Sequence, residues 1–182
     1  MVSGFSLEPF RDLYPFESRF FEPGGHRMHY LDEGEGEPLL MLHGNPTWSF
    51  YYRNLIKGLK SQFRCVVPDH MGCGLSDKPQ DYPYTLSQHI DNLESLVEHL
   101  KLDRLTLVMH DWGGAIGMGF AVRYPEMIKR LVIFNTAAFI ADRIPFSINL
   151  CRQSTLGPLA ILRFNLFAKL ATSWASKVPG RM

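Results

Sequence analysis

Cysteine is scarce in this sequence of 182 residues: there are three, Cys65, Cys73 and Cys151. Three is too few, and an odd number, for a disulfide framework, and their spacing matches no zinc motif. We therefore expect free thiols in a reducing compartment, which indicates a cytoplasmic protein, and we expect no metal site.

Long hydrophobic runs and an excess of one charge are missing as well. No apolar stretch approaches the roughly 20 residues that a membrane-spanning helix needs. The first residues include a glutamate, Glu8, and lack the apolar central run of a signal peptide. We therefore expect neither a signal peptide nor a membrane span. The formal net charge is +1, from 19 Lys and Arg against 18 Asp and Glu. This balance argues against nucleic acid as a partner.

The sequence does contain enough apolar residues, 46%, for one globular core. Short apolar runs alternate with segments of helical periodicity, a pattern that predicts right-handed βαβ units and a mostly parallel sheet, hence an α/β fold. The predicted strands cover residues 20–22, 27–32, 39–42, 63–67, 105–109 and 128–135, and the predicted helices cover 49–59, 87–100 and 113–122. On the helix at 87–100, we expect His89 and His99 at the surface.

The composition changes near residue 140. Residues 146–182 are rich in Leu, Ala, Phe and Trp at helical spacing, interrupted at Gly157 and Pro158. We therefore predict a core in residues 1–140 and part of a helical cap in residues 141–182. This segment is either a peripheral helical pair or a lid over an apolar pocket.

One acid, Asp111, lies between a predicted strand buried on both faces, Leu105–Met109, and a predicted glycine-rich helix that begins near Gly113. A sharp strand-to-helix turn of this kind is the nucleophile-elbow geometry, with Asp in place of the usual Ser. The amides and dipole of the helix N-terminus favour an ionised carboxylate there, and a carboxylate can attack carbon and form an ester. An ordinary N-cap aspartate is the alternative.

Two further loops follow predicted strands. One is His43-Gly-Asn-Pro-Thr-Trp48, and the other is Asp69-His-Met-Gly-Cys-Gly-Leu-Ser-Asp-Lys-Pro79. A metal site built from Asp69, His70, Cys73 and Asp77 is conceivable, but these residues lack a recognisable ligand spacing. We expect no metal there.

Together, the two loops and His110-Asp-Trp-Gly-Gly114 resemble motifs of the haloalkane dehalogenases, which have the α/β-hydrolase fold. The resemblance covers roughly residues 20–182. The sequence is also similar to the β-lactone decarboxylases of bacterial long-chain olefin biosynthesis. The features that suggest this second group are Gly72-Cys-Gly-Leu-Ser76, Asn135-Thr-Ala-Ala-Phe139, Arg152 and Asn165. Both groups share the elbow, so the motifs separate them poorly.

The resemblance implies that Asp111 is the nucleophile, and that the Asn45 amide and the Trp112 indole stabilise a departing halide. Their backbone N–H groups would form an oxyanion hole. A turn residue before Pro46 is the alternative for Asn45, and a buried aromatic is the alternative for Trp112. His43 and His110 are expected to be structural hydrogen-bonding residues, and no cofactor is implied.

Two parts of the family pattern are missing. No histidine follows His110, and Asn135 occupies the position where some dehalogenases place the acid of the triad. The resemblance therefore implies that the base, the acid and two of eight strands lie outside this chain, which by itself would not turn over.

The predicted function is hydrolysis of a carbon–halide bond in a small apolar haloalkane, through an ester on Asp111 that water cleaves. The alternative is decarboxylation of a cis-3-alkyl-4-alkyloxetan-2-one to an alkene. The third possibility is a non-catalytic fragment. Because the resemblance places two strands outside this chain, the strand at 128–135 would form an open sheet edge, which predicts self-association or pairing with a complementing chain.

Overall fold

The computed structural model describes residues 6–137, 157 and 159–175. The chain divides into two compact units, Met1–Ala138 and Phe139–Met182. Most of the predicted cap, 141–182, lies outside the described residues, including Cys151 and Arg152. Its boundary and its role as a lid remain predictions.

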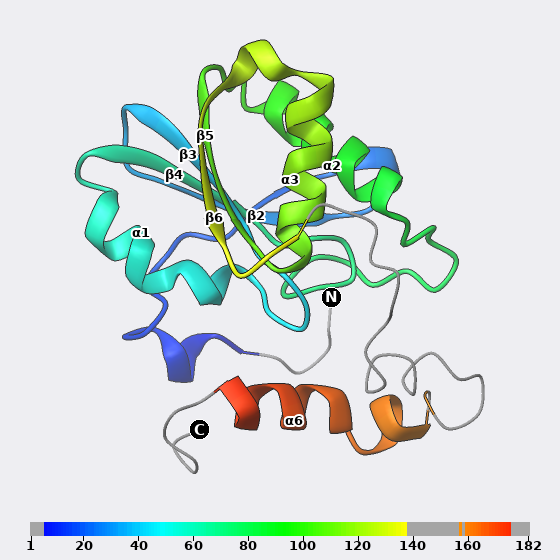
Figure 1. Ribbon diagram of the computed structural model, residues 1–182. Helices are drawn as coiled ribbons and strands as arrows, with labels where there is room; N and C mark the ends of the chain where they lie inside the picture. Colours follow the sequence, from blue (N-terminus) through cyan, green and yellow to red (C-terminus); the bar gives the residue numbers. More distant parts are fainter. Residues whose placement is uncertain (1–5, 138–156, 158, 176–182) are drawn as a thin grey trace. The chain divides into compact units, whose positions relative to one another are not determined.

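A six-stranded sheet forms the first unit, in the order β1-β2-β4-β3-β5-β6 (Figure 1). The four strands β3 to β6 pair in parallel, whereas β1 and β2 join the sheet antiparallel at one side. This arrangement confirms the predicted mostly parallel sheet. The strands are β1 Arg19–Phe21, β2 Met28–Glu33, β3 Glu37–Leu42, β4 Phe63–Pro68, β5 Leu105–His110 and β6 Ile128–Phe134.

Helices cover both faces of this sheet (Figure 1). Helix α1, Arg53–Leu59, follows a 3-10 turn at Ser49–Tyr52 and packs on one face, while α2, Leu86–His99, and α3, Trp112–Arg123, pack on the other. Strand β5 lies between both layers and is buried over nearly its whole length. That burial explains why its sequence is mostly apolar, with Thr106 as its one polar residue before His110.

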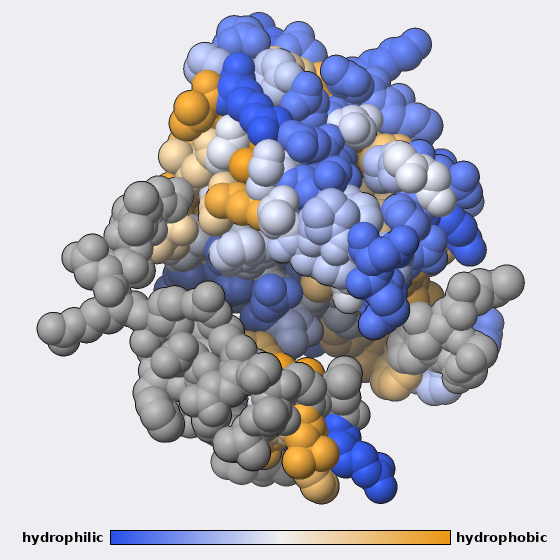
Figure 2. Space-filling view, turned by 90° about the vertical axis from the view of Figure 1, so that its right-hand side faces the viewer, coloured by the Kyte–Doolittle hydropathy of each residue, from blue (hydrophilic) through white to orange (hydrophobic). Residues whose placement is uncertain are grey.

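Helix α2 shows how local signals and tertiary contacts combine. Thr85 caps its N-terminus by accepting a hydrogen bond from the Gln88 N–H, at 3.2 Å. His99 is exposed, as expected, but the prediction for His89 is wrong: its side chain is buried. The His89 and His70 rings meet edge to face, with ring centroids 5.8 Å apart, a contact with a distant loop that helical periodicity does not reveal. Figure 2 shows a largely hydrophilic outer surface on the side of the molecule that carries α2.

The second unit contributes a π-helical turn, Leu159–Arg163, and helix α6, Leu166–Ala175. Within the residues that the structure describes, no helix is both long enough and apolar enough to cross a membrane.

Candidate active site

The connection between β5 and α3 is a sharp turn at one residue. Asp111 has φ 50° and ψ −126°, and α3 begins at the next residue, Trp112. A positive φ at a residue with a side chain costs roughly 1–3 kcal/mol and persists only where the surroundings enforce it. The turn places the Asp111 side chain outside the sheet, at the N-terminus of the helix.

Three glycines make this turn sterically possible. A Cβ atom at Gly113 would collide with the carbonyl of Leu42 in β3, and one at Gly44 would collide with the Asp111 carboxylate. Gly114 is equally confined, because a Cβ there would strike the Thr136 side chain. The two glycines that mark the elbow in the sequence therefore leave room for the β3 backbone, at Gly113, and for the Thr136 side chain, at Gly114.

The carboxylate of Asp111 is exposed and has one partner in the loop after β3. Its Oδ1 accepts a hydrogen bond from the backbone N–H of Asn45 at 2.8 Å. The main chain of Asp111 is fixed as well, because its carbonyl accepts bonds from the Thr136 hydroxyl at 2.5 Å and the Gly114 N–H at 3.0 Å. The structure thus brings together two predicted site residues that lie 66 positions apart in the chain.

Two polar side chains beside Asp111 have unused donors. Among the described residues, neither the Asn45 amide nitrogen nor the Trp112 indole nitrogen has a hydrogen-bond acceptor. Trp112 is 40% exposed, so it is not the buried aromatic residue that was the alternative. A carboxylate with nearby donors suits a displacement in which negative charge develops on the leaving group.

A buried carboxylate, Asp69, holds the two site loops together. It accepts the Ser49 N–H at 2.7 Å and the Leu75 N–H at 2.8 Å, and its Oδ2 lies 2.9 Å from Nδ1 of His29. Burial raises the pKa of Asp69, but the His29 imidazole and the N–H donors outweigh burial and hold this pKa below its usual value. The carboxylate therefore stays ionised and links β2 to both loops.

A histidine pair provides a second link between these loops. The His70 N–H donates to Nε2 of His43 at 3.0 Å, and Nε2 of His70 lies 3.0 Å from the His43 carbonyl. Because Nε2 of His43 accepts, the proton resides on Nδ1, which donates to the Gly44 carbonyl at 3.0 Å. Burial lowers the pKa of both imidazoles, so both are neutral hydrogen-bonding groups. His43 thus has the structural contacts that the sequence led us to expect.

Comparison with known proteins identifies the family of this chain. The model of the alpha/beta hydrolase fold family matches residues 37–156. The chain belongs to this family. A cis-3-alkyl-4-alkyloxetan-2-one decarboxylase from Shewanella oneidensis is 53% identical over 166 residues, which are 88% of this chain and 52% of the relative. Haloalkane dehalogenase 2 from Mycobacterium tuberculosis is 43% identical over 170 residues, covering 93% of this chain and 59% of the relative.

Solved structures agree with this family assignment. The haloalkane dehalogenase DatA from Agrobacterium tumefaciens C58 superposes with a TM-score of 0.80 at 26% identity, covering 91% of this chain and 58% of DatA. The predicted resemblance to dehalogenases and to β-lactone decarboxylases is therefore confirmed. This α/β hydrolase chain spans between half and three fifths of the length of the curated relatives described above.

The four conceivable metal ligands of this α/β hydrolase do not converge. Asp69 and His70 are bonded as described, Asp77 accepts the Arg27 N–H at 2.8 Å, and the Cys73 thiol contacts Asn45. Among the described residues, no group of three or more His, Cys, Asp or Glu side chains is placed to hold a metal ion.

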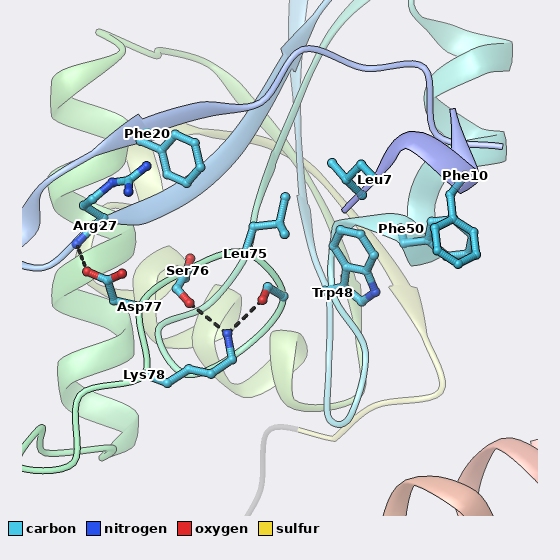
Figure 3. A pocket seen from close by; sticks show the side chains of 11 residues that line it. Leu7, Phe10, Phe20, Arg27, Trp48, Phe50, Leu75, Ser76, Asp77 and Lys78 are labelled. Atoms are coloured by element: carbon cyan, nitrogen blue, oxygen red, sulfur yellow. Dashed lines mark hydrogen bonds between the residues drawn. The ribbon is translucent and has the colours of Figure 1, made fainter. Parts of the chain in front are cut away.

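A pocket of about 740 Å³ adjoins the same two loops (Figure 3). Trp48 and Phe50 extend into it from positions shortly after Asn45, and Leu75 extends into it from the loop after β4. None of the three predicted site residues lines it. The remaining lining residues are Leu7, Phe10, Phe20, Arg27, Gly74, Ser76, Asp77 and Lys78.

Proposed function

We propose that the full-length protein uses Asp111 as a carbon nucleophile. The observation that carries this proposal is the exposed carboxylate of Asp111, which is held by the Asn45 N–H at the strained turn before α3. The Asn45 amide and the Trp112 indole supply donors for the charge that develops on the leaving group. No residue of this mechanism requires a cofactor.

We propose a cis-3-alkyl-4-alkyloxetan-2-one as the substrate. The sequence motifs placed a haloalkane first, but the identity is 53% with the S. oneidensis decarboxylase and 43% with the M. tuberculosis dehalogenase. The difference supports the β-lactone, which was the alternative prediction.

Asp111 can decompose such a lactone without consuming water. One carboxylate oxygen attacks ring carbon C4, and the C4–O bond breaks to leave a carboxylate on the substrate. The bond between C3 and that carboxylate then breaks, and its electron pair forms the alkene as the Asp111 carboxylate leaves C4. Carbon dioxide and the alkene are the products, and Asp111 is regenerated. Asn45 and Trp112 would stabilise the oxygen that is released when the ring opens.

Haloalkane hydrolysis is the second candidate, favoured by the same two donors, since a departing halide needs N–H groups aimed at it. In that reaction Asp111 displaces the halide and remains bound as an ester. Water must then cleave the ester, so this route needs a general base that the lactone route does not.

The test is an assay of the full-length protein with a long-chain cis-β-lactone and with a brominated alkane. We expect alkene and carbon dioxide from the lactone, and a loss of several orders of magnitude in Asp111→Asn, which keeps the shape of the side chain but not its nucleophilicity. Asn45→Ala and Trp112→Phe should each lower kcat by roughly 10²–10³. Asp103→Asn is the control, because Asp103 is an exposed carboxylate that lies before β5.

Each alternative has its own result in this assay. Bromide release without alkene formation would support the dehalogenase instead. Turnover that survives in Asp111→Asn would rule out the nucleophile, and no turnover of either substrate would contradict both proposed reactions.

A further inference from the structure

The Asn45 side chain has an acceptor end and a donor end, and the described residues engage only the acceptor. Its Oδ1 accepts a hydrogen bond from the Cys73 thiol, with the sulfur 3.6 Å away. We propose that Cys73 is a positioning residue that fixes the orientation of the Asn45 amide, so that the NH2 group and not the oxygen is available to the substrate at Asp111. The catalytic meaning of this inference rests on the proposed function.

The orientation matters because the two ends of an amide have nearly the same shape and opposite polarity. The NH2 end stabilises developing negative charge, whereas the oxygen end repels it. A thiol is a weak donor and a weak acceptor, and here its S–H donates to the amide oxygen, which leaves the NH2 group outside this contact. Burial raises the pKa of the Cys73 thiol to about 11, so the thiol keeps its proton at neutral pH and remains a donor.

The loops that carry the two side chains are fixed independently of this contact. Cys73 closes a turn in which its N–H donates to the His70 carbonyl at 2.8 Å. Asn45 is held through its own N–H on Asp111, and Thr47 closes the following turn on the Gly44 carbonyl at 2.9 Å. Loss of the thiol therefore removes a constraint on the amide rotamer while the backbone of both loops stays bonded.

Cys65 is a matched comparison within the same chain. Its thiol also has a raised pKa and is buried, whereas Cys73 is only partly buried, and the Cys65 sulfur lies 3.9 Å from the carbonyl of Phe63 in its own strand, β4. A role in packing alone would therefore apply to Cys65 at least as strongly as to Cys73. A role in orienting Asn45 applies only to Cys73.

The test uses the full-length protein with Cys73→Ala, Cys73→Ser and Cys65→Ala. We expect Cys73→Ala to lower kcat by about three- to tenfold, the effect of one hydrogen bond, with little change in melting temperature. Cys73→Ser restores an O–H donor and should recover most of this loss. Cys65→Ala should lower the melting temperature and have little effect on kcat. In an Asn45→Ala background, Cys73→Ala should have no further effect, because the thiol acts through the amide.

A spectroscopic measurement separates this inference from the proposed function. The side-chain NH2 signals of Asn45 in a ¹H–¹⁵N spectrum, assigned by their loss in Asn45→Ala, should shift or broaden in Cys73→Ala and keep their positions in Cys65→Ala. If the signals change while neither substrate is turned over, the positioning role stands and the proposed function fails. Unchanged signals in Cys73→Ala, or effects of Asn45→Ala and Cys73→Ala that simply add, would overturn the positioning role.

Discussion

The carboxylate of Asp69 shows how much of the site depends on one buried charge. It is fully buried, and its bonds reach Ser49 and Leu75 in separate loops as well as His29 in β2. A buried carboxylate is stable only when its oxygens are paired with donors, and here every partner is a nitrogen. The ionised Asp69 carboxylate therefore holds the residues that follow Asn45 and Cys73 in the two loops.

Asp69→Asn should destabilise the protein by about 3–5 kcal/mol, because the new NH2 group faces donors and the charge opposite His29 is lost. Urea unfolding of the full-length protein measures this. Asp32→Asn is the control, since Asp32 makes two bonds with Arg64, at 2.7 and 2.8 Å, but at a partly exposed position. That partly exposed pair should contribute about 1 kcal/mol or less, because solvent screens it. Equal losses in the two variants would contradict the role given to Asp69.

Individual residues differ in how far the sequence identifies them. Asp111 can be proposed from the sequence because an acid between an apolar strand and two glycines forms a local pattern, and the structure places it at the turn before α3. The role of Asp69 was not found, since Asp before a glycine-rich loop looks the same whether it is solvated or buried. Its partner Ser49 lies 20 positions away, and nothing in the local sequence indicates that contact. The burial of His89 was missed for the same reason.

At the level of elements, the strands were predicted best. The strand expected at 105–109 is β5, Leu105–His110, and the one expected at 128–135 is β6, Ile128–Phe134. The helix expected at 49–59 is less regular, since its first turn, Ser49–Tyr52, is a 3-10 helix. The Ser49 N–H in that turn is bonded to the Asp69 carboxylate, a tertiary contact that helical periodicity cannot anticipate.

The crossing of α3 over β3 gives a prediction about two glycines. Gly113→Ala should destabilise the protein by roughly 1–3 kcal/mol or more, because its Cβ meets backbone atoms of Leu42 and His43 that cannot move without disturbing β3. Gly58→Ala should instead stabilise it by about 0.5–1 kcal/mol, since Gly58 lies in α1 with open space around its Cβ position. Thermal unfolding of both variants measures these changes in stability. If both variants were stabilised or both destabilised, the close approach of α3 to β3 at Gly113 would be contradicted.

At the scale of the whole chain, the main prediction is that the outer edge of β6 pairs with another chain. Among the described residues β6 pairs only with β5, and three of its apolar side chains, Leu131, Ile133 and Phe134, are 41%, 56% and 44% exposed. An apolar strand with unpaired N–H and C=O groups is a template for pairing with another chain. A second copy of this chain or a complementing chain would satisfy the same groups.

We therefore predict that the 182-residue chain, expressed alone, self-associates through β6. Ile133→Lys should raise the monomer fraction, because a charged side chain on an edge strand opposes pairing by another strand. Val122→Lys is the matched control: Val122 is 77% exposed, but it lies on α3, so its effect should be small. Size-exclusion chromatography with light scattering measures the outcome. A wild-type chain that is monomeric at micromolar concentration, or equal effects of the two lysines, would show that β6 is not the contact.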